Sequence, residues 1–220
     1  MTFKSKTAER IFTTAFNLAV TFVFISGVAL AYLTTREKIL DNEAMFLKRA
    51  ILEAAGKEVP KESDALRKTY DSLVTEEALP DGGRCFRVKD AASGESDGFV
   101  IVTTTPGLWG TITAAVGITR QGGETAITGL AIIDQNETPG LGGRITEDWF
   151  LGQFRGKLGP FRMVPEGTRS TDKNEFDAIT GATITSTAMQ TLLNNTCDRA
   201  GALWSSPGSP QDPEKGAAAP

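Results

Sequence analysis

The longest apolar run of the chain lies near its N-terminus. Residues 11–32 (IFTTAFNLAVTFVFISGVALAY) carry no charged side chain. A helix of this length spans about 33 Å at a rise of about 1.5 Å per residue, enough to cross the hydrocarbon core of a bilayer. A cleaved signal peptide is the alternative, but its apolar region is usually shorter and ends in small residues at a cleavage site. Here the run leads directly into Thr34, Arg36 and Lys38, so we expect a retained transmembrane helix that follows a short cytoplasmic segment, 1–10.

Basic residues flank this run on both sides. They are Lys4, Lys6 and Arg10 before it and Arg36, Lys38, Lys48 and Arg49 after it. Orientation usually follows an excess of lysine and arginine on the cytoplasmic side. The charge pattern therefore leaves the orientation of the predicted helix open.

Helical periodicity continues beyond the apolar run. The apolar positions at helical spacing are Ile39, Leu40, Phe46, Leu47, Ile51 and Leu52. Gly56 and Pro60 then supply a stop signal. A second short helix is predicted around Leu66, Tyr70 and Leu73, which share one face before the turn at residues 80–83. We expect residues 33–80 to form a helical stalk and the helices that lead into the domain.

The pattern changes after residue 83 to short segments rich in β-forming residues. These segments are 84–88, 98–104, 111–119 and 126–133, separated by Gly, Pro, Ser and Asp. They predict an antiparallel or mixed sheet. Helical patterns return at 145–154 and 184–195, so we expect one α+β domain over 81–204. The last segment, 205–220 (SSPGSPQDPEKGAAAP), is too poor in apolar residues to fold and is predicted to be a disordered tail.

Composition narrows the classes of function. With 220 residues, 40% hydrophobic, the chain can bury one ordinary core. A formal net charge of -4 gives no basic surface for nucleic acid. The absence of histidine excludes imidazole bases, Ser-His and Cys-His pairs and most catalytic zinc sites. Cys85 and Cys197 form no CxxC pair, so we predict no metal site; they are either two free thiols or one disulfide.

The candidate chemistry lies in residues 177–186 (DAITGATITS), a small, hydroxyl-rich stretch before an apolar-periodic segment. We interpret it as a loop that opens a helix. Gly181 and Ala182 leave room for a ligand near the backbone, and the unpaired amides of a first helical turn favour a phosphate. Thr183 would point its hydroxyl into that site. The alternative is that Thr180, Thr183 and their neighbours only cap the helix.

Residues 177–183 (DAITGAT) resemble the covalent flavinylation motif of the FMN-binding domain family, which includes the G subunit of the Rnf complex and the C subunit of the sodium-translocating NADH:quinone reductase. The family pattern is an Asp, two variable residues, Ser or Thr, and then Gly, Ala and Thr. In that family a flavin transferase joins the phosphate of FMN to the last threonine through a phosphoester. The resemblance implies covalent FMN at Thr183, with Asp177 as part of the recognition sequence.

Two further segments are similar to the same family. Residues 137–142 (ETPGLG) are similar to its ETPGLG loop, which lies against the flavin, and residues 106–110 (PGLWG) are similar to its Gly-x-Trp turn. The expected flavin contacts are Thr180, Gly181, Ala182, Glu137, Thr138, Leu141, Gly142 and Trp109. Leu141 would offer an apolar face, with glycines letting the loop approach the ring. Glu137 would bond the flavin or cap the helix at 145–154. Alone, these segments would be an ordinary turn and a core tryptophan.

The resemblance covers roughly residues 10–200 and implies a function. It implies an FMN-binding domain anchored by one helix in the bacterial inner membrane, on the periplasmic face. Such a protein relays electrons within an ion-translocating oxidoreductase complex, with other membrane subunits and a flavin transferase as partners and no catalytic residue of its own. We favour the Rnf type because the chain is short for the quinone-reductase protein. The alternatives are the C subunit of that reductase, an anchored accessory protein without flavin, and a domain that binds FMN noncovalently.

Overall fold

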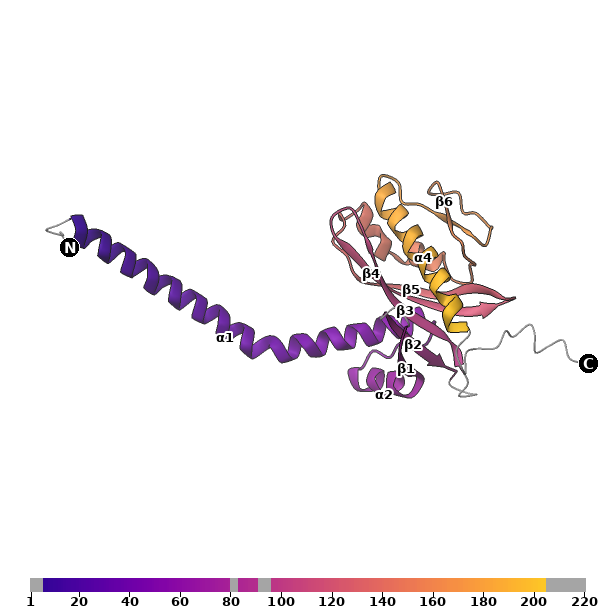
Figure 1. Cartoon of the computed structure of the whole chain (residues 1–220), viewed down its shortest axis with the longest axis horizontal. Coiled ribbons are helices and arrows are strands. Elements are labelled where there is room, and N and C mark those ends of the chain that lie inside the picture. The colour runs from indigo at the N-terminus through magenta and orange to yellow at the C-terminus, as the bar shows by residue number, and fades with distance from the viewer. Residues whose placement is uncertain (1–5, 80–82, 91–95, 205–220) are drawn as a thin grey trace, which may run out of the picture. The chain divides into compact units, whose positions relative to one another are not determined.

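A computed structural model of the chain describes residues 6–79, 83–90 and 96–204. The predicted tail at 205–220, the first five residues and the predicted turn at 80–82 lie outside the described residues. The elements are α1 (Lys6–Ala54), α2 (Ser63–Leu73), β1 (Val74–Ala78), β2 (Arg84–Lys89), β3 (Ser96–Pro106), β4 (Thr111–Gln121), β5 (Glu124–Asp134), η1 (Gly142–Thr146), α3 (Asp148–Gly152), β6 (Arg162–Val164), β7 (Glu175–Asp177) and α4 (Thr183–Trp204) (Figure 1).

The N-terminal helix α1 belongs to two units. Residues 1–44 form one unit, and residues 45–220 form the other. The predicted membrane helix and the predicted stalk join in α1, a single helix of 49 residues. Its apolar part is long and apolar enough to cross a membrane, and none of that part is buried. The helix ends at Ala54, and Gly56 follows with a φ of 68°, a left-handed conformation that glycine adopts at helix ends.

The segment predicted as helical up to residue 80 ends in a strand. Helix α2 matches the prediction, but Val74–Ala78 forms β1, which pairs antiparallel with β2. Its sequence, VTEEA, is short and rich in glutamate, which disfavours strands. The strand is held by pairing with its neighbour, where Glu76 and Glu77 form ion pairs with Arg84 and Arg87. Pairing across strands is not visible in a local pattern.

The central sheet contains five antiparallel strands in the order β1-β2-β3-β4-β5. The four strand segments predicted from the sequence are present as β2 to β5, and the α+β class is confirmed. Gly122 and Gly123 join β4 to β5 with φ angles of 60° and 87°, which suit a tight hairpin turn. A small parallel pair, β6 and β7, was not predicted because each strand has only three residues.

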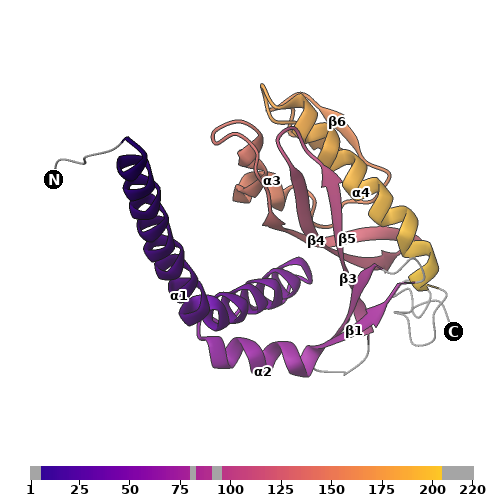
Figure 2. The same cartoon turned by 60° about the vertical axis from the view of Figure 1, so that its left-hand side comes forward.

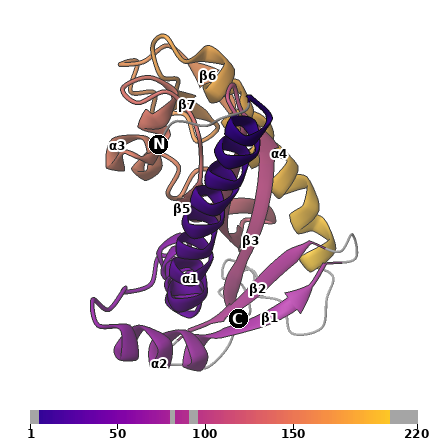
Figure 3. The same cartoon turned by 90° about the vertical axis from the view of Figure 1, so that its left-hand side faces the viewer.

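Helices cover both faces of the sheet. Alternate residues of β3 point to opposite sides, with Phe99 in the core beneath α4 and Val100 in the core formed by α2 and the end of α1. Helix α4 crosses β3 and β4 on the face of the sheet that carries Phe99 (Figure 2). Helix α2 lies at the β1 end of the sheet, away from α4 (Figure 3). The start of α4 is thereby held against a rigid sheet.

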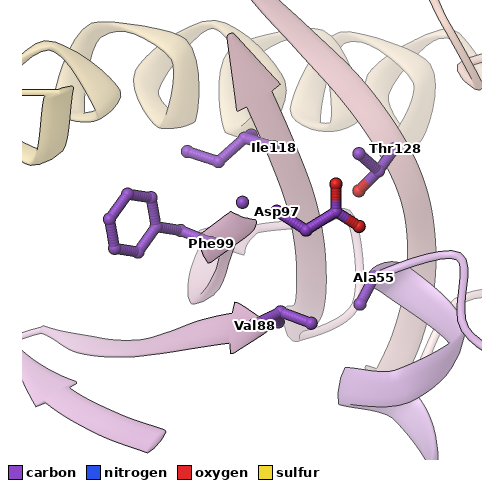
Figure 4. Close-up of a pocket in the computed structure, with 7 residues that line it drawn as sticks. Ala55, Val88, Asp97, Phe99, Ile118 and Thr128 are labelled. Atoms are coloured by element: carbon purple, nitrogen blue, oxygen red, sulfur yellow. The ribbon is translucent and has the colours of Figure 1, made fainter. Parts of the chain in front are cut away.

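The end of α1 approaches the sheet at two paired glycines. Gly117 and Gly129 face each other across β4 and β5, and a Cβ on them would lie 1.9 Å and 2.7 Å from the carbonyl oxygen of Ala54. Thr128 Oγ1 donates a hydrogen bond of 2.9 Å to that oxygen. Figure 4 shows the space beside this contact, lined in part by Ala55 and Thr128. Its volume of about 10 Å³ has room for at most one water molecule, so it is a packing gap.

Both cysteines are free thiols. Cys85 is buried in the core beneath α4, and Cys197 is half-buried on α4 itself. Burial is the main cause that raises the pKa of Cys85 to about 12 and the pKa of Cys197 to about 11. Both side chains therefore stay protonated and unreactive near neutral pH, and of the two alternatives left by the sequence the structure shows the pair of free thiols.

Candidate functional site

The flavinylation-like motif forms a loop that opens a helix, as the sequence predicts. Residues 178–182 leave β7, and α4 begins at Thr183. Gly181 has a φ of 79°, and a Cβ there would lie 3.1 Å from Leu141 Cδ2. Glycine is therefore needed for the turn, and a Cβ here would crowd Leu141 of the neighbouring loop.

The four hydroxyl residues of the motif lie in different surroundings. Thr185 is buried and donates to Glu137 Oε2 at 2.5 Å. Ser186 is buried, accepts from the amide of Ile179 and donates to the carbonyl of Ala182, both at 3.0 Å. Thr180 is exposed and bonds Glu166 through its amide. Thr183 is exposed at the first position of α4, and its hydroxyl has no hydrogen-bond partner among the described residues.

Carboxylates fix the loop before Thr183. Asp177 is buried and accepts hydrogen bonds from the amides of Gly167, at 2.8 Å, and Arg169. Glu166 accepts two hydrogen bonds from Arg144, of 3.2 and 2.8 Å, and one of 2.6 Å from the amide of Thr180. The hydrogen bonds from Arg144 are the main cause that lowers the pKa of Glu166 to about 2. Glu166 is therefore ionised at neutral pH, and neither it nor Arg144 was singled out from the sequence.

A cavity of about 250 Å³ lies between this loop and the 137–142 segment. It is lined by Leu108, Glu137, Thr138, Leu141, Gly142, Gly181, Ala182, Thr183, Ile184 and Thr185. Seven of the nine site residues expected from the sequence are in this lining, whereas Thr180 and Trp109 are not. Leu108, Ile184 and Thr185 were missed. All three lie within segments that the sequence analysis singled out, 106–110 and 177–186, and this position was the signal that could have found them.

A second cavity adjoins the same threonine. It has a volume of about 370 Å³ and is lined by Thr105, Pro106, Thr183, Ile184, Thr187, Ala188 and Thr191. Thr183 and Ile184 line both cavities. Together the two spaces fall within the usual size of cofactor pockets. A group attached to Thr183 would have room on either side.

Glu137 makes hydrogen bonds within the fold that the sequence did not predict. Its buried carboxylate accepts from the amides of Leu108 and Trp109, at 2.8 and 3.0 Å, and from the hydroxyl of Thr185. It caps neither nearby helix, because the residues at the N-caps of η1 and α3 are Leu141 and Glu147. The cap hypothesis was therefore wrong. Gly142 packs against Glu137 and Thr185, so its small size serves this contact.

Exposed apolar side chains surround the cavities. Trp109 is 69% exposed and Leu141 is 43% exposed, and the Nε1 of Trp109 donates to Thr138 Oγ1 at 3.0 Å. Leu108 and Ile184 are also exposed. The reading of Trp109 as a core residue was wrong, because this indole lies at the surface.

The site is suited to an anionic group joined to a flat apolar one. The first amides of α4 have no partners within the helix and favour a phosphate next to the free hydroxyl of Thr183. The exposed leucines, Ile184 and Trp109 offer apolar surfaces to a ring. Among the described residues no cluster of His, Cys, Asp or Glu could hold a metal ion. These observations fit a phosphate-bearing cofactor such as FMN.

Comparison with known proteins identifies relatives for this arrangement. Residues 107–198 match the FMN-binding domain family. The chain is 34% identical over 182 residues to the G subunit of the ion-translocating oxidoreductase complex of Pseudoalteromonas atlantica, covering 79% of this chain and 80% of that protein. It is 31% identical over 185 residues to the corresponding G subunit of Methanosarcina acetivorans, covering 81% and 90%.

Other matches are shorter or more distant. The chain is 40% identical over 105 residues to the G subunit of the Na(+)-translocating ferredoxin:NAD(+) oxidoreductase complex of Acetobacterium woodii, and this match spans 47% of the chain and only 49% of that protein. The crystal structure of Shewanella oneidensis NqrC has a TM-score of 0.59 at 20% identity and covers 67% of this chain and 88% of that one. The C subunit of the Na(+)-translocating NADH-quinone reductase of Parabacteroides distasonis has a TM-score of 0.62 at 21% identity, covering 78% and 98%. These two structures share the fold.

Proposed function

Because this chain belongs to the family of the G subunits of ion-translocating oxidoreductase complexes, we propose that it holds its FMN through a phosphoester to Thr183 and relays electrons between redox partners of such a complex. The coarser assignment, an FMN flavoprotein subunit of an ion-translocating oxidoreductase, follows from the family itself. The sequence matches to the C subunit of the NADH-quinone reductase cover less of the chain than those to the G subunits of Pseudoalteromonas and Methanosarcina, for example 38% for the Vibrio anguillarum protein. This difference favours the G-subunit type.

The main support for the proposal is that the Thr183 hydroxyl is exposed and has no hydrogen-bond partner among the described residues. A phosphoester needs a hydroxyl that a transferase can reach. Thr185 and Ser186 are buried, and their hydroxyls are used within the fold, whereas Thr183 is exposed and unbonded among the described residues. It also begins α4, where the helix favours a phosphate. These facts support Thr183 as the acceptor.

The chain's own residues would bind and orient the cofactor. Bound FMN supplies one- and two-electron redox chemistry, which the protein's side chains lack. Leu141 and Trp109 offer apolar faces near the attachment point, and the amides at the start of α4 would bond the phosphate. Attachment through the phosphate leaves the ring unmodified and prevents loss of the cofactor. A flavin transferase and the other subunits of the complex are the partners that this role requires.

A denaturing gel viewed under ultraviolet light before staining tests the covalent bond. The chain produced together with a flavin transferase should show a fluorescent band at its own mass, because a phosphoester survives denaturation. The same chain produced without the transferase is the control and should be dark. Flavin that runs ahead of the protein would indicate noncovalent FMN, and absence of flavin from both samples would favour an accessory protein without cofactor.

We further propose that α1 anchors the chain in the bacterial inner membrane with the FMN domain on the periplasmic side. The apolar part of α1 and the family support anchoring, and the side follows from the resemblance because the flanking charges are balanced. A secreted phosphatase fused after Pro220 should be active, and a fluorescent protein that matures only in the cytoplasm should be dark at that position. The reverse pair of results would place the domain in the cytoplasm.

A further inference from the structure

Three segments that are distant in the sequence meet at the carboxylate of Glu137. Its Oε1 accepts hydrogen bonds from two consecutive amides in the turn after β3, Leu108 at 2.8 Å and Trp109 at 3.0 Å. Its Oε2 accepts from Thr185 Oγ1 in the first turn of α4 at 2.5 Å. Glu137 itself follows β5, and the residue is only 5% exposed. One side chain thus joins the turn, the loop and the helix that line the cavity.

The backbone around this carboxylate leaves no room for other side chains. A Cβ on Gly107 would lie 2.5 Å from Glu137 Oε1. A Cβ on Gly142 would lie 2.8 Å from Oε2 and 2.5 Å from Thr185 Oγ1. Real Cβ atoms do not approach other atoms so closely, so the two glycines are needed for the carboxylate to reach its three donors. The sequence is adapted to this contact from two separate segments.

Burying a carboxylate is costly unless hydrogen bonds replace its hydration. The three donors to Glu137 supply them, but each is a neutral group, two amides and one hydroxyl. The negative charge is therefore held in place without being cancelled by these donors. A glutamine would offer one carbonyl oxygen to the two amides but no second carboxylate oxygen to Thr185, whereas a glutamate offers an oxygen to each side.

We propose that Glu137 is the positioning residue of the flavin site: it fixes the 107–110 turn and the first turn of α4 in one arrangement and sets a negative charge in the cavity wall. This inference rests on the proposed attachment at Thr183. Thr185 lies two positions after Thr183 on α4, so the bond to Glu137 holds the rotation of that first turn and the direction of the Thr183 side chain. The charge disfavours added negative charge on a reduced ring and lowers its potential.

The two parts of this role respond to different substitutions. Glu137→Gln keeps a carbonyl oxygen for the two amides but removes the charge, so the midpoint potential of the bound flavin should rise while covalent FMN is retained. Thr185→Val keeps the volume and the charge but removes the donor, so the visible circular dichroism of the flavin should change. Thr185→Ser restores the hydroxyl and should restore the wild-type spectrum. Glu124→Gln, at an exposed acid that begins β5, is the matched control and should change neither property.

A second measurement needs no flavin. Hydrogen exchange at the amides of Leu108 and Trp109 should be slow in the wild-type full-length chain and in the Glu124→Gln control. In Glu137→Ala these amides lose their acceptor, and exchange should be about tenfold to a hundredfold faster, as for a lost hydrogen bond to a charged group. If Glu137→Ala does not fold, Glu137→Gln and Thr185→Val still give the optical and potential measurements.

The outcomes separate this inference from the proposed function. Wild-type protein without covalent FMN would contradict the attachment at Thr183, and the exchange measurement would still test the role of Glu137. Wild-type protein with covalent FMN, together with folded Glu137→Gln and Thr185→Val variants of unchanged potential and spectrum, would overturn the inference. Unchanged exchange at Leu108 and Trp109 in folded Glu137→Ala would overturn it as well.

Discussion

Replacing Thr183 by valine is expected to abolish covalent FMN completely, even when a flavin transferase is produced together with the chain. Valine has nearly the same shape as threonine but no hydroxyl, and a phosphoester cannot form without one. The folded state should be little affected, because the lost hydroxyl is exposed and bonds no described residue. A lost helix cap typically costs about 1 kcal/mol, a small part of a stability of about 5 to 15 kcal/mol. Mass spectrometry of the intact protein measures the increment of one FMN minus water.

The matched control for this variant is Thr187→Val. Thr187 is an exposed threonine of the same helix, whose hydroxyl donates to the carbonyl of Thr183 at 2.9 Å, and it should keep the full mass increment. Thr185→Val would be a poor control, because its hydroxyl is buried and bonds Glu137. An increment that persists in Thr183→Val and vanishes in Thr187→Val would show that the acceptor was assigned to the wrong threonine.

Two truncated chains that begin ten residues apart within or just after α1 are expected to behave in opposite ways: the longer one should fold and the shorter one should not. A chain that begins at Met45 lacks the apolar part of α1 but keeps the second unit whole, so it should fold and leave the membrane fraction. A chain that begins at Ala55 also loses Ile51 and Leu52, which are fully buried. Loss of such side chains costs about 2 to 5 kcal/mol each, which is comparable to the whole stability of a domain. This shorter chain should be unfolded or aggregated.

Membrane fractionation and thermal unfolding followed by circular dichroism distinguish these results. A chain from Met45 that still sediments with membranes would indicate a second attachment to the bilayer. Equal unfolding temperatures for the two chains would show that the end of α1 is not part of the core. The predicted boundary between the membrane helix and the stalk, at residues 32 and 33, stays a prediction.

Local patterns predicted the parts of the fold that are built locally. The strands β2 to β5 alternate or carry β-branched residues, and α2 has a clear apolar face, so each was found from its own residues. Strand β1 depends on pairing with β2, and β6 and β7 on each other, so a local pattern could not show them. The end of α1 was predicted from Gly56, since a left-handed glycine at a helix end is a local requirement.

The sequence predicted which segments form the site, but not which side chains in them contact one another. The motif at 177–183 and the loop at 137–142 were expected to meet, and they line one cavity. Which hydroxyl is free depends on the rotation of α4 about its own axis. Successive residues of a helix are about 100° apart, so a different rotation would bury Thr183 and expose Thr185. The contact of Glu137 with Leu108 and Trp109 spans 29 and 28 residues, and that of Arg144 with Glu166 spans 22. Such pairings exist only once the chain has folded.

The contact between the end of α1 and the glycines of β4 and β5 also bears on the order of events during synthesis. Thr128, which bonds the carbonyl of Ala54, comes 74 residues later in the chain. A ribosome releases the N-terminal residues first, so the last turn of α1 emerges long before the strands that cover it. Until β5 is complete, Ile51 and Leu52 have no partner surface on those strands. During this interval, set by distance along the chain, the buried side of the end of α1 is open to proteases and to aggregation.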